Sequence, residues 1–393
     1  MEQIPYQPWK HLQWSQGHVL ETYPSYTPSW EGWKENDHVE LNSLKEQIDV
    51  FEKDGSWEQR KKLANIYELV YTHDEKKTPL CLATAKPLSR SYFKMIEMLH
   101  LISFFQRFPK VKKFRSTHVC EGPGGFIQAF CEEAHRNHKD IEVCLTMTLR
   151  PTHSHIPGWK RAAQFLRKHP EVKITYGADG TGDIYSPDNQ AAFQGELGPN
   201  KSHLFTADGG FDFKMDYMHQ EQIAFRLIVA SFAIAFESLV EGGVCIVKLF
   251  DTFGNTTQEF IGFVSCFFKT WTLYKPAMSR PCNSERYFIG VGFRGTNETV
   301  SEIFKKIQVD LSNHQISDLE SLFRNPSFTE SIEAIKRFQH TQEQVQIQTL
   351  KTAIQASLDK PWEHWKESYK ASEVWCKTFP IAWRQLIAHD HLA

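Results

Sequence analysis

The sequence predicts an α/β fold whose sheet is mostly parallel and covered by helices on both faces. Between residues 86 and 298, short runs rich in β-branched and aromatic residues alternate with longer runs of helical periodicity, which is the pattern of successive β-α-β units. Both flanks are mainly helical in pattern. We therefore predict three regions: an aromatic arm with helices over 1–85, the α/β domain over 86–298, and a helical region over 299–393.

The first region begins with an arm in which prolines and aromatic residues alternate as far as Trp33. The density of prolines forbids a long helix, so the rings are expected either to pack onto the main domain or to stack on RNA bases. Apolar residues then follow helical spacing over 41–51, where Gly55 can end the helix, and again over 57–71. Two helices are therefore expected after the arm.

The α/β domain is expected to begin with a helix that holds Tyr92 and Ile102. A later helix from about Gln220 to Leu239 is expected to be closed by Gly242 and Gly243. Because ligands bind at the carboxyl ends of the strands in such sheets, polar residues there are functional candidates. The predicted strands are Thr117–Cys120, Glu142–Leu149, Val172–Tyr176, Leu204–Asp208, Val244–Phe250, Thr272–Lys275 and Tyr287–Phe293.

The last region is expected to hold a long, polar helix over 328–358 that Pro361 ends. Tryptophans follow it, and aromatic residues at this spacing form either a small packed cluster or a surface for RNA or a partner. These tryptophans are Trp362, Trp365, Trp375 and Trp383.

Composition limits the class of protein. The formal net charge of −2 gives no overall attraction to nucleic acid, so an RNA partner would need a local basic surface. The eight cysteines contain no C-x-x-C pair, which favours reduced thiols in an intracellular protein, nuclear or cytoplasmic and not secreted. The start of the chain is not expected to be a signal peptide. The apolar stretch 223–240 contains Arg226 and Glu237, so a membrane span is not expected.

A glycine-rich turn follows the first strand of the domain and opens a helix. Its glycines allow a ligand to approach the backbone, but the pattern is neither G-x-G-x-x-G nor a phosphate-binding P-loop. An acid at the start of the turn suits a ligand with an amine or a ribose, and S-adenosylmethionine has both. The alternative is a turn that only packs the helix on the strand. The candidate cofactor residues are Glu121, Gly122, Pro123, Gly124, Gly125 and Phe126.

Asp183 is a further candidate, because it follows a predicted strand in Gly182-Asp183-Ile184. Its carboxylate could accept the amino group of an adenine. The same position is equally consistent with a simple Asx turn.

Asp208 and Lys248 each end a buried strand, where an unpaired charge is costly. They could simply pair with each other. They could also activate a ribose hydroxyl, because a lysine that is desolvated beside another cation can have a lowered pKa and accept a proton. Lys94 would supply the second cation, and Asp208 and Glu285 would orient the lysines. Whether Lys248 removes the proton or steers the hydroxyl lone pair stays open at this point.

Cations cluster next to Glu285 in the sequence. Lys275, Arg280 and Arg286 fall in or beside the segment that leads to it, and their charges suit an RNA backbone. The alternative is that they are ordinary surface charges on a loop.

The middle region resembles the FtsJ-like ribose 2′-O-methyltransferases, and is most similar to the cap-specific mRNA enzymes. The resemblance runs in family order over about 210 residues, a little over half the chain. The matching segments are Ser89-Arg90-Ser91 with Phe93-Lys94-Met95, Gly122-Pro123-Gly124-Gly125-Phe126, Met147-Thr148-Leu149, Gly182-Asp183-Ile184, Ala207-Asp208-Gly209-Gly210-Phe211, Val247-Lys248-Leu249-Phe250-Asp251, and Lys275-Pro276 through Ser279-Arg280-Pro281 to Asn283-Ser284-Glu285-Arg286-Tyr287.

The resemblance implies a Rossmann-like, S-adenosylmethionine-dependent methyltransferase fold and a catalytic tetrad of Lys94, Asp208, Lys248 and Glu285. It implies that the cofactor lies near residues 121–126, Thr148, Asp183 and Asp208, and that the chemistry needs no metal. The implied partners are RNA, with 5′-capped mRNA favoured, and other capping or transcription proteins, and the implied target is the ribose of the first or second nucleotide. The candidate substrate-binding residues are Arg90, Lys275, Arg280, Asn283, Ser284 and Arg286.

This sequence departs from the cap enzymes after the Asp208-Gly209-Gly210 element. The segment 211–217 does not map onto their cap-contacting polar residues. A 2′-O-methyltransferase of ribosomal or transfer RNA therefore stays open, as does a catalytically silent RNA-binding scaffold with the same fold. Metal hydrolysis is poorly supported, because His153 and His155 lack a third partner at ligand spacing.

Overall fold

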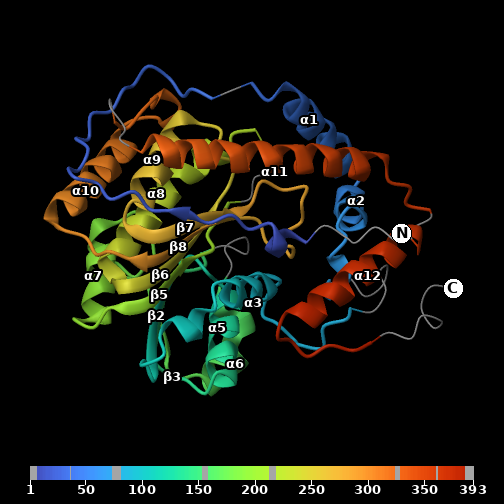
Figure 1. The fold of residues 1–393 in the computed structure, drawn as a ribbon, viewed down its shortest axis with the longest axis horizontal. Helices are drawn as coiled ribbons and strands as arrows, with labels where there is room; N and C mark the ends of the chain where they lie inside the picture. The colour runs from blue at the N-terminus through green and yellow to red at the C-terminus, as the bar shows by residue number, and fades with distance from the viewer. Residues whose placement is uncertain are drawn as a thin grey trace.

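A mixed sheet forms the centre of the molecule (Figure 1). The computed structural model describes residues 7–35, 37–72, 81–152, 158–211, 218–323, 328–359 and 362–385, with the side chains of 362–364 left aside. Within these residues the sheet has eight strands in the order β1-β7-β8-β6-β5-β2-β3-β4.

Parallel pairing joins β4, β3, β2, β5 and β6, whereas β8, β7 and β1 extend the sheet with antiparallel pairing. The predicted α/β fold with a mostly parallel sheet is confirmed. The strands are β1 Ser15–Gln16, β2 Lys113–Val119, β3 Asp140–Met147, β4 Val172–Thr175, β5 Ser202–Ala207, β6 Leu239–Leu249, β7 Phe268–Tyr274 and β8 Arg286–Phe293.

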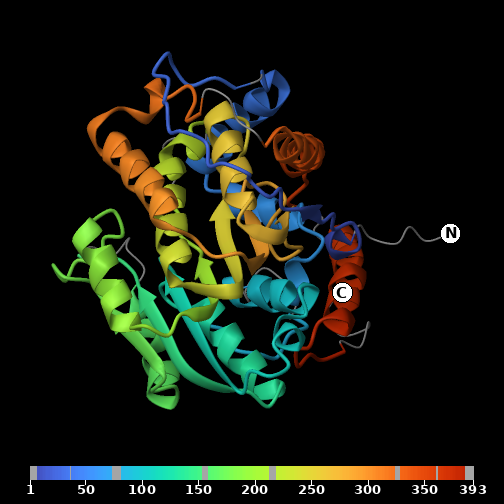
Figure 2. The ribbon, with the colours of Figure 1, turned by 60° about the vertical axis from the view of Figure 1, so that its left-hand side comes forward.

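Helices cover both faces of this sheet, because successive strand residues point to opposite sides. In β6, Cys245 and Val247 join the apolar core beneath α8 and α9, whereas Val244 and Ile246 join the core beneath α3 and α5. Figures 1 and 2 show these two layers on either side of the sheet. The helices are α1 Val39–Lys53, α2 Trp57–Leu63, α3 Ser91–Leu101, α4 Phe104–Arg107, α5 Gly125–Arg136, α6 Ala163–Lys168, α7 Pro187–Leu197, α8 Gln220–Ser238, α9 Asn255–Ser265, α10 Glu298–Asn313, α11 Thr329–Gln355 and α12 Trp362–Thr378, with 3-10 turns η1 Pro8–Lys10, η2 Glu68–Val70, η3 Trp159–Ala162 and η4 Ile316–Asp318.

The predicted end of the second helix and the predicted closure of the long helix by glycines were wrong, and β2, β6 and β7 begin four or five residues earlier than predicted. The second helix ends at Leu63 instead of residue 71, because the side chain of Asn65 accepts a hydrogen bond from the backbone N–H of Tyr67 and so forms a competing turn. The long helix α8 ends at Ser238, and β6 begins at the next residue. Gly242 and Gly243 therefore lie inside a strand instead of closing a helix.

The aromatic arm packs onto the main domain. Its strand β1 pairs with the edge strand β7, and the ring of Tyr23 stacks on Phe267 at a centroid distance of 5.9 Å. The Trp33 ring meets Phe225 edge-on at 6.0 Å. For these rings the packing interpretation is confirmed, whereas Trp14 stays 36% exposed.

The C-terminal region is helical, as predicted, and packs back on the rest of the chain. Helix α11 contacts α1, α2 and α9, and Trp365 and Trp375 of α12 are buried in the core that also contains α3. The predicted tryptophan cluster is thus present for these two, with Trp383 packed against it. Pro361 lies outside the described residues. No helix in the described part of the chain combines the length and the apolarity needed to cross a membrane.

Candidate active site

The sheet topology brings three of the four predicted catalytic residues to one edge of the sheet. Asp208 directly follows β5 and Lys248 lies near the end of β6, and these strands are parallel neighbours with Ala207 beside Val247. Because β8 runs antiparallel to β6, its start places Glu285 at the same edge. Lys94 reaches the site from the first turn of α3.

The four side chains form a chain of alternating charges. The Lys94 Nζ lies 2.6 Å from one oxygen of Glu285, and the other oxygen of Glu285 lies 3.7 Å from the Lys248 Nζ. Lys248 in turn donates to the Asp208 carboxylate at 3.2 Å and to the Asp208 backbone carbonyl at 3.1 Å. Each side chain is only 10–14% exposed. Residues predicted from separate motifs therefore meet in one cluster.

The charge state of Lys248 differs from the prediction of a lowered pKa. Burial acts to lower the pKa of the Lys248 amine, but Asp208 and Glu285 outweigh burial and raise that pKa above its ordinary value. Burial acts to raise the pKa of Glu285, and Lys94 and Lys248 outweigh it and hold that pKa well below its usual range. The prediction failed because Lys94 is paired with Glu285 instead of leaving its charge uncompensated near Lys248. Lys248 is therefore an ammonium group in this arrangement.

Tyr287 is a site residue that the sequence did not single out. Its hydroxyl donates to the Asp208 carboxylate at 2.7 Å, the Lys94 ammonium lies 6.0 Å from the centre of its ring, and Phe126 packs against it at 5.8 Å. The available signal was its position, two residues after Glu285 in a strand, which places both side chains on one face.

The turn that carries Glu285 is held from inside. The buried Lys275 Nζ donates to the backbone carbonyl and side-chain oxygen of Asn283, both at 2.8 Å, and to the carbonyl of Glu285 at 2.7 Å. Burial lowers the pKa of Lys275 to about 7. The hydroxyl of the buried Ser284 donates to Gln220. Of the predicted substrate residues, Lys275, Asn283 and Ser284 thus shape the turn around Glu285.

The three predicted arginines also make internal contacts. Arg286 is 1% exposed and pairs with Asp251 at 2.8 Å. Arg280 makes a two-pronged contact with the buried Glu68 at 2.8 and 3.0 Å, and Arg90 lies 3.4 Å from the same carboxylate. Despite its burial, the pKa of Glu68 is lowered to about 2 by Arg90 and Arg280.

In two of these arginines the internal ion pair does not use the whole guanidinium group. The Nη2 group of Arg90 is buried and has no hydrogen-bond partner among the described residues. The side chain of Arg280 is 22% exposed. Arg280 therefore stays partly accessible, whereas the unpaired Nη2 of Arg90 is enclosed and Arg286 is fully buried.

The glycine-rich turn is closely packed. Gly124 has a φ of 101° and caps α5, and a β-carbon there would lie 3.0 Å from the ring of Trp159. A β-carbon on Gly125 would lie 2.3 Å from the hydroxyls of Ser89 and Ser91. Phe126 is buried in the core. Trp159, which sequence reasoning missed, therefore lies against the turn.

Glu121 is buried at the start of this turn, with its two carboxylate oxygens next to Thr206 and His118. Thr206 donates to its Oε1, whereas Oε2 has no hydrogen-bond partner among the described residues. The nearest cation to Oε2, His118 Nδ1 at 3.2 Å, is engaged with the Thr206 hydroxyl at 2.6 Å. Buried polar side chains thus hold Glu121 at the start of the turn.

The other predicted cofactor residues lie on neighbouring turns. Thr148 follows β3 and is 6% exposed. Its backbone carbonyl lies close to Gly182, so that a β-carbon added to Gly182 would lie 2.0 Å from the Thr148 carbonyl oxygen. The Asp183 carboxylate accepts the backbone N–H of Tyr185 at 2.9 Å. The Asx turn is therefore present at Asp183, and a carboxylate in such a turn still has a second oxygen for a ligand.

The packing of Gly125 gives a testable prediction. Gly125→Ala should lower the stability of the fold by about 1–3 kcal/mol, because its methyl group would overlap the hydroxyls of Ser89 and Ser91. Gly195→Ala is the matched control, since its methyl group meets nothing within 4 Å in the last turn of α7. The control should be neutral or slightly stabilising. Urea unfolding of both variants measures the difference, and equal stabilities would contradict the close packing of this turn.

Comparison with known proteins identifies the family to which the α/β domain is similar. A sequence model of the FtsJ-like methyltransferase family matches residues 87–293. Curated relatives bear the name "Cap-specific mRNA (nucleoside-2'-O-)-methyltransferase 1". The relative from Leishmania braziliensis is 29% identical over 67% of this chain and 66% of its own length, that from Trypanosoma cruzi 34% over 48% and 50%, and that from Xenopus laevis 29% over 55% and 26%.

The aligned part thus spans between about a quarter and two thirds of the relatives' own lengths. The family match covers more than half of this chain, and it includes α3, the glycine-rich turn and every strand from β2 to β8. The chain therefore belongs to the FtsJ-like methyltransferase family, whose methyl donor is S-adenosylmethionine.

Proposed function

We propose that this protein methylates a ribose 2′-hydroxyl of RNA, at the first or second nucleotide of capped mRNA. The observation that carries the proposal is the chain of alternating charges from Lys94 through Glu285 and Lys248 to Asp208, next to the glycine-rich turn that begins with the buried Glu121. The names of the relatives support RNA, and a cap, as the substrate.

The residues around the turn fit the cofactor of the family. Glu121 would accept hydrogen bonds from a ribose or an amine, Asp183 those of the adenine amino group, and the backbone around Gly124 would allow close approach. Thr148 would line the same space. When bound, S-adenosylmethionine supplies an electrophilic methyl group on a sulfonium.

Lys248 would hold the attacking hydroxyl. Since its pKa is raised, Lys248 enters the reaction as an ammonium that donates to the hydroxyl oxygen and thereby directs a lone pair at the methyl carbon. Asp208 and Glu285 hold the ammonium in place, and Lys94 and Tyr287 fix these two carboxylates. As the oxygen gains the methyl group it becomes strongly acidic, so its proton passes to water. Positioning of this kind supplies much of the rate of group transfer.

The flanking regions would support the substrate side of this site. The α/β domain 86–298 carries the transfer in this proposal, and 1–85 supplies Glu68, which holds Arg90 and Arg280. Region 299–393 supplies Trp375, whose indole N–H donates at 2.8 Å to Glu97, one turn along α3 from Lys94. Arg280, whose side chain is 22% exposed, is then placed to meet an RNA phosphate, and Arg90 holds the same carboxylate of Glu68 from inside.

The test is transfer of labelled methyl from S-adenosylmethionine to a short RNA with and without a 5′ cap, followed by nuclease mapping. Label in a 2′-O-methylated nucleotide next to the cap, and absent from uncapped RNA, is the expected result. Equal label on both RNAs would replace the cap proposal with an internal-site enzyme of ribosomal or transfer RNA. No label on either, with the cofactor bound, would favour a silent RNA-binding scaffold.

A further inference from the structure

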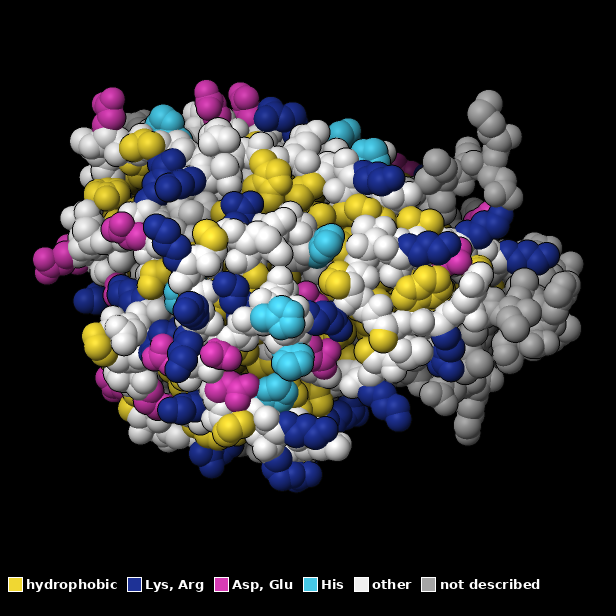
Figure 3. All heavy atoms as spheres, turned by 60° about the horizontal axis from the view of Figure 1, so that its bottom comes forward, with side chains coloured by type: hydrophobic (Ala, Val, Ile, Leu, Met, Phe, Trp, Pro, Cys, Tyr) yellow, Lys and Arg dark blue, Asp and Glu magenta, His cyan; other side chains and the backbone are white. Residues whose placement is uncertain are grey.

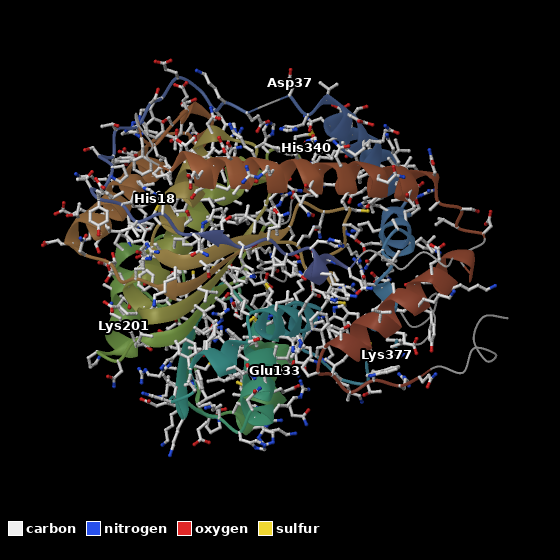
Figure 4. The ribbon with its side chains drawn as sticks, in the orientation of Figure 1. His18, Asp37, Glu133, Lys201, His340 and Lys377 are labelled. Atoms are coloured by element: carbon white, nitrogen blue, oxygen red, sulfur yellow. The ribbon has the colours of Figure 1, made fainter. Side chains whose placement is uncertain are left out.

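A cluster of three potential metal ligands lies away from the candidate active site. Cys131 is buried on α5, and His169 and Glu171 lie in the segment between α6 and β4. The ligand atoms of these three residues all lie within 4.8 Å of one another. Among the described residues, no other group of three or more His, Cys, Asp or Glu side chains is arranged in this way. Glu133, labelled in Figure 4, marks the same helix α5.

The donor types select the ion. A thiolate, an imidazole and a carboxylate are the ligands of Zn²⁺, whereas Mg²⁺ and Ca²⁺ prefer oxygen alone. Tetrahedral zinc with bonds of about 2.0–2.3 Å needs its ligand atoms roughly 3.4–3.6 Å apart. The observed spread of up to 4.8 Å therefore requires the donors to close by about an ångström, which side-chain rotation can supply.

A cavity gives an ion access to this cluster. It has a volume of about 530 Å³ and is lined by Cys131, His169 and Glu171 together with His135, which lies one helical turn after Cys131 on α5. The imidazole of His135 is exposed, so His135 or a water molecule can take the fourth position. Figure 3 shows histidines beside acidic side chains on the face that carries α5 and α6.

The simplest alternative is an ion pair beside an unrelated thiol. His169 Nδ1 does lie 2.8 Å from the Glu171 carboxylate, and the His169 ring packs on Phe165 at 4.5 Å. An ion pair alone would not require a cysteine sulfur to face the same pair across an open cavity. The third donor, the thiol of Cys131, distinguishes a metal site from a simple ion pair between His169 and Glu171.

We infer that Cys131, His169 and Glu171 bind Zn²⁺ and thereby fasten the α6–β4 segment to α5. Strand β4 is the edge strand of the sheet and pairs only with β3, so it gains most from a link to a neighbouring helix. It leads into the turn that carries Asp183. With the thiol deprotonated, the thiolate and the carboxylate balance the charge of the ion, and about one proton is released for each ion bound.

The experiment uses the full-length, reduced protein after removal of metal with a chelator. Zinc titration by calorimetry in two buffers of different ionisation enthalpy should show one ion and about one released proton. Substitution with Co²⁺ should give a thiolate-to-metal charge-transfer absorption. Zinc should also raise the melting temperature. Absence of stoichiometric binding, or a cobalt spectrum without the thiolate band, would overturn the inference.

Variants locate the ion. Cys131→Ser, His169→Gln and Glu171→Gln should each weaken zinc binding at least tenfold, whereas the thiol control Cys81→Ser, at a partly exposed cysteine beside Thr72, should not. Cys131 is buried, so its variant could fail to fold. His169 and Glu171 are partly exposed, so their variants test zinc binding without this complication. Unchanged affinity in both of those variants would show that the ion binds elsewhere and would overturn the assignment.

Discussion

Lys248→Ala is expected to lower the rate of methyl transfer by a factor on the order of a hundred to ten thousand while S-adenosylmethionine still binds. The Lys248 ammonium is held between Asp208 and Glu285 at 3.2 and 3.7 Å, where it can donate to an incoming hydroxyl. Its ammonium contacts Asp208, Glu285 and the ring of Phe250, none of which belongs to the glycine-rich turn, so the affinity for the cofactor should change little. The loss should therefore appear in the rate of the chemical step and not in the affinity for S-adenosylmethionine.

Single-turnover transfer to capped RNA, together with calorimetric titration of S-adenosylmethionine, separates these two quantities. Lys306→Ala is the control, because this lysine is exposed on α10. Unchanged transfer in Lys248→Ala would refute the proposed mechanism. Loss of cofactor binding together with transfer would instead make Lys248 a structural residue, whose removal leaves the Asp208 carboxylate without its ammonium partner.

Much of this site could be predicted because its residues follow rules of topology. Asp208 and Lys248 end adjacent parallel strands, and the carboxyl ends of such strands meet at one edge. The sequence does not contain the distances between charges, so it could not predict the charge state of Lys248. That state depends on Glu285 lying between both lysines, which only the packed structure specifies.

The surroundings of the site were harder to predict, because their partners are distant in sequence. Arg280 pairs with Glu68, 212 positions earlier, and the sequence around either residue resembles that of an ordinary surface charge. Asp251 likewise encloses Arg286. The two-residue strand β1 could not be predicted either, because it is defined by its pairing with β7 and not by any periodicity in the sequence of the arm.

The same dependence on packing governs the boundaries of the helices. The apolar spacing of 57–71 is helical, yet the Asn65 side chain offers the backbone a competing turn and the helix ends at Leu63. Propensity and periodicity indicate that a helix exists, but a single side-chain hydrogen bond decides where it ends.

Glu285→Gln is expected to lower the free energy of unfolding by about 3–5 kcal/mol near neutral pH. Glu285 is 8% exposed and its carboxylate lies between the ammonium groups of Lys94 and Lys248. The amide keeps the shape of the side chain but leaves both cations without their shared counter-charge. Urea unfolding of the variant measures the loss, and Glu302→Gln on the exposed side of α10 should stay within about 0.5 kcal/mol of the parent protein.

The pH dependence of this difference tests whether charge is its cause. The pKa of Glu285 is depressed in the folded protein, so its stabilising contribution is complete above the unfolded-state pKa of 4.5 and is lost as the pH falls through the folded-state value. The stability difference between the parent protein and Glu285→Gln should therefore shrink as the pH falls below the unfolded-state pKa of Glu285. A difference that persists undiminished in acid would assign the loss to the geometry of the amide, because protonation would already have removed the charge from the parent carboxylate.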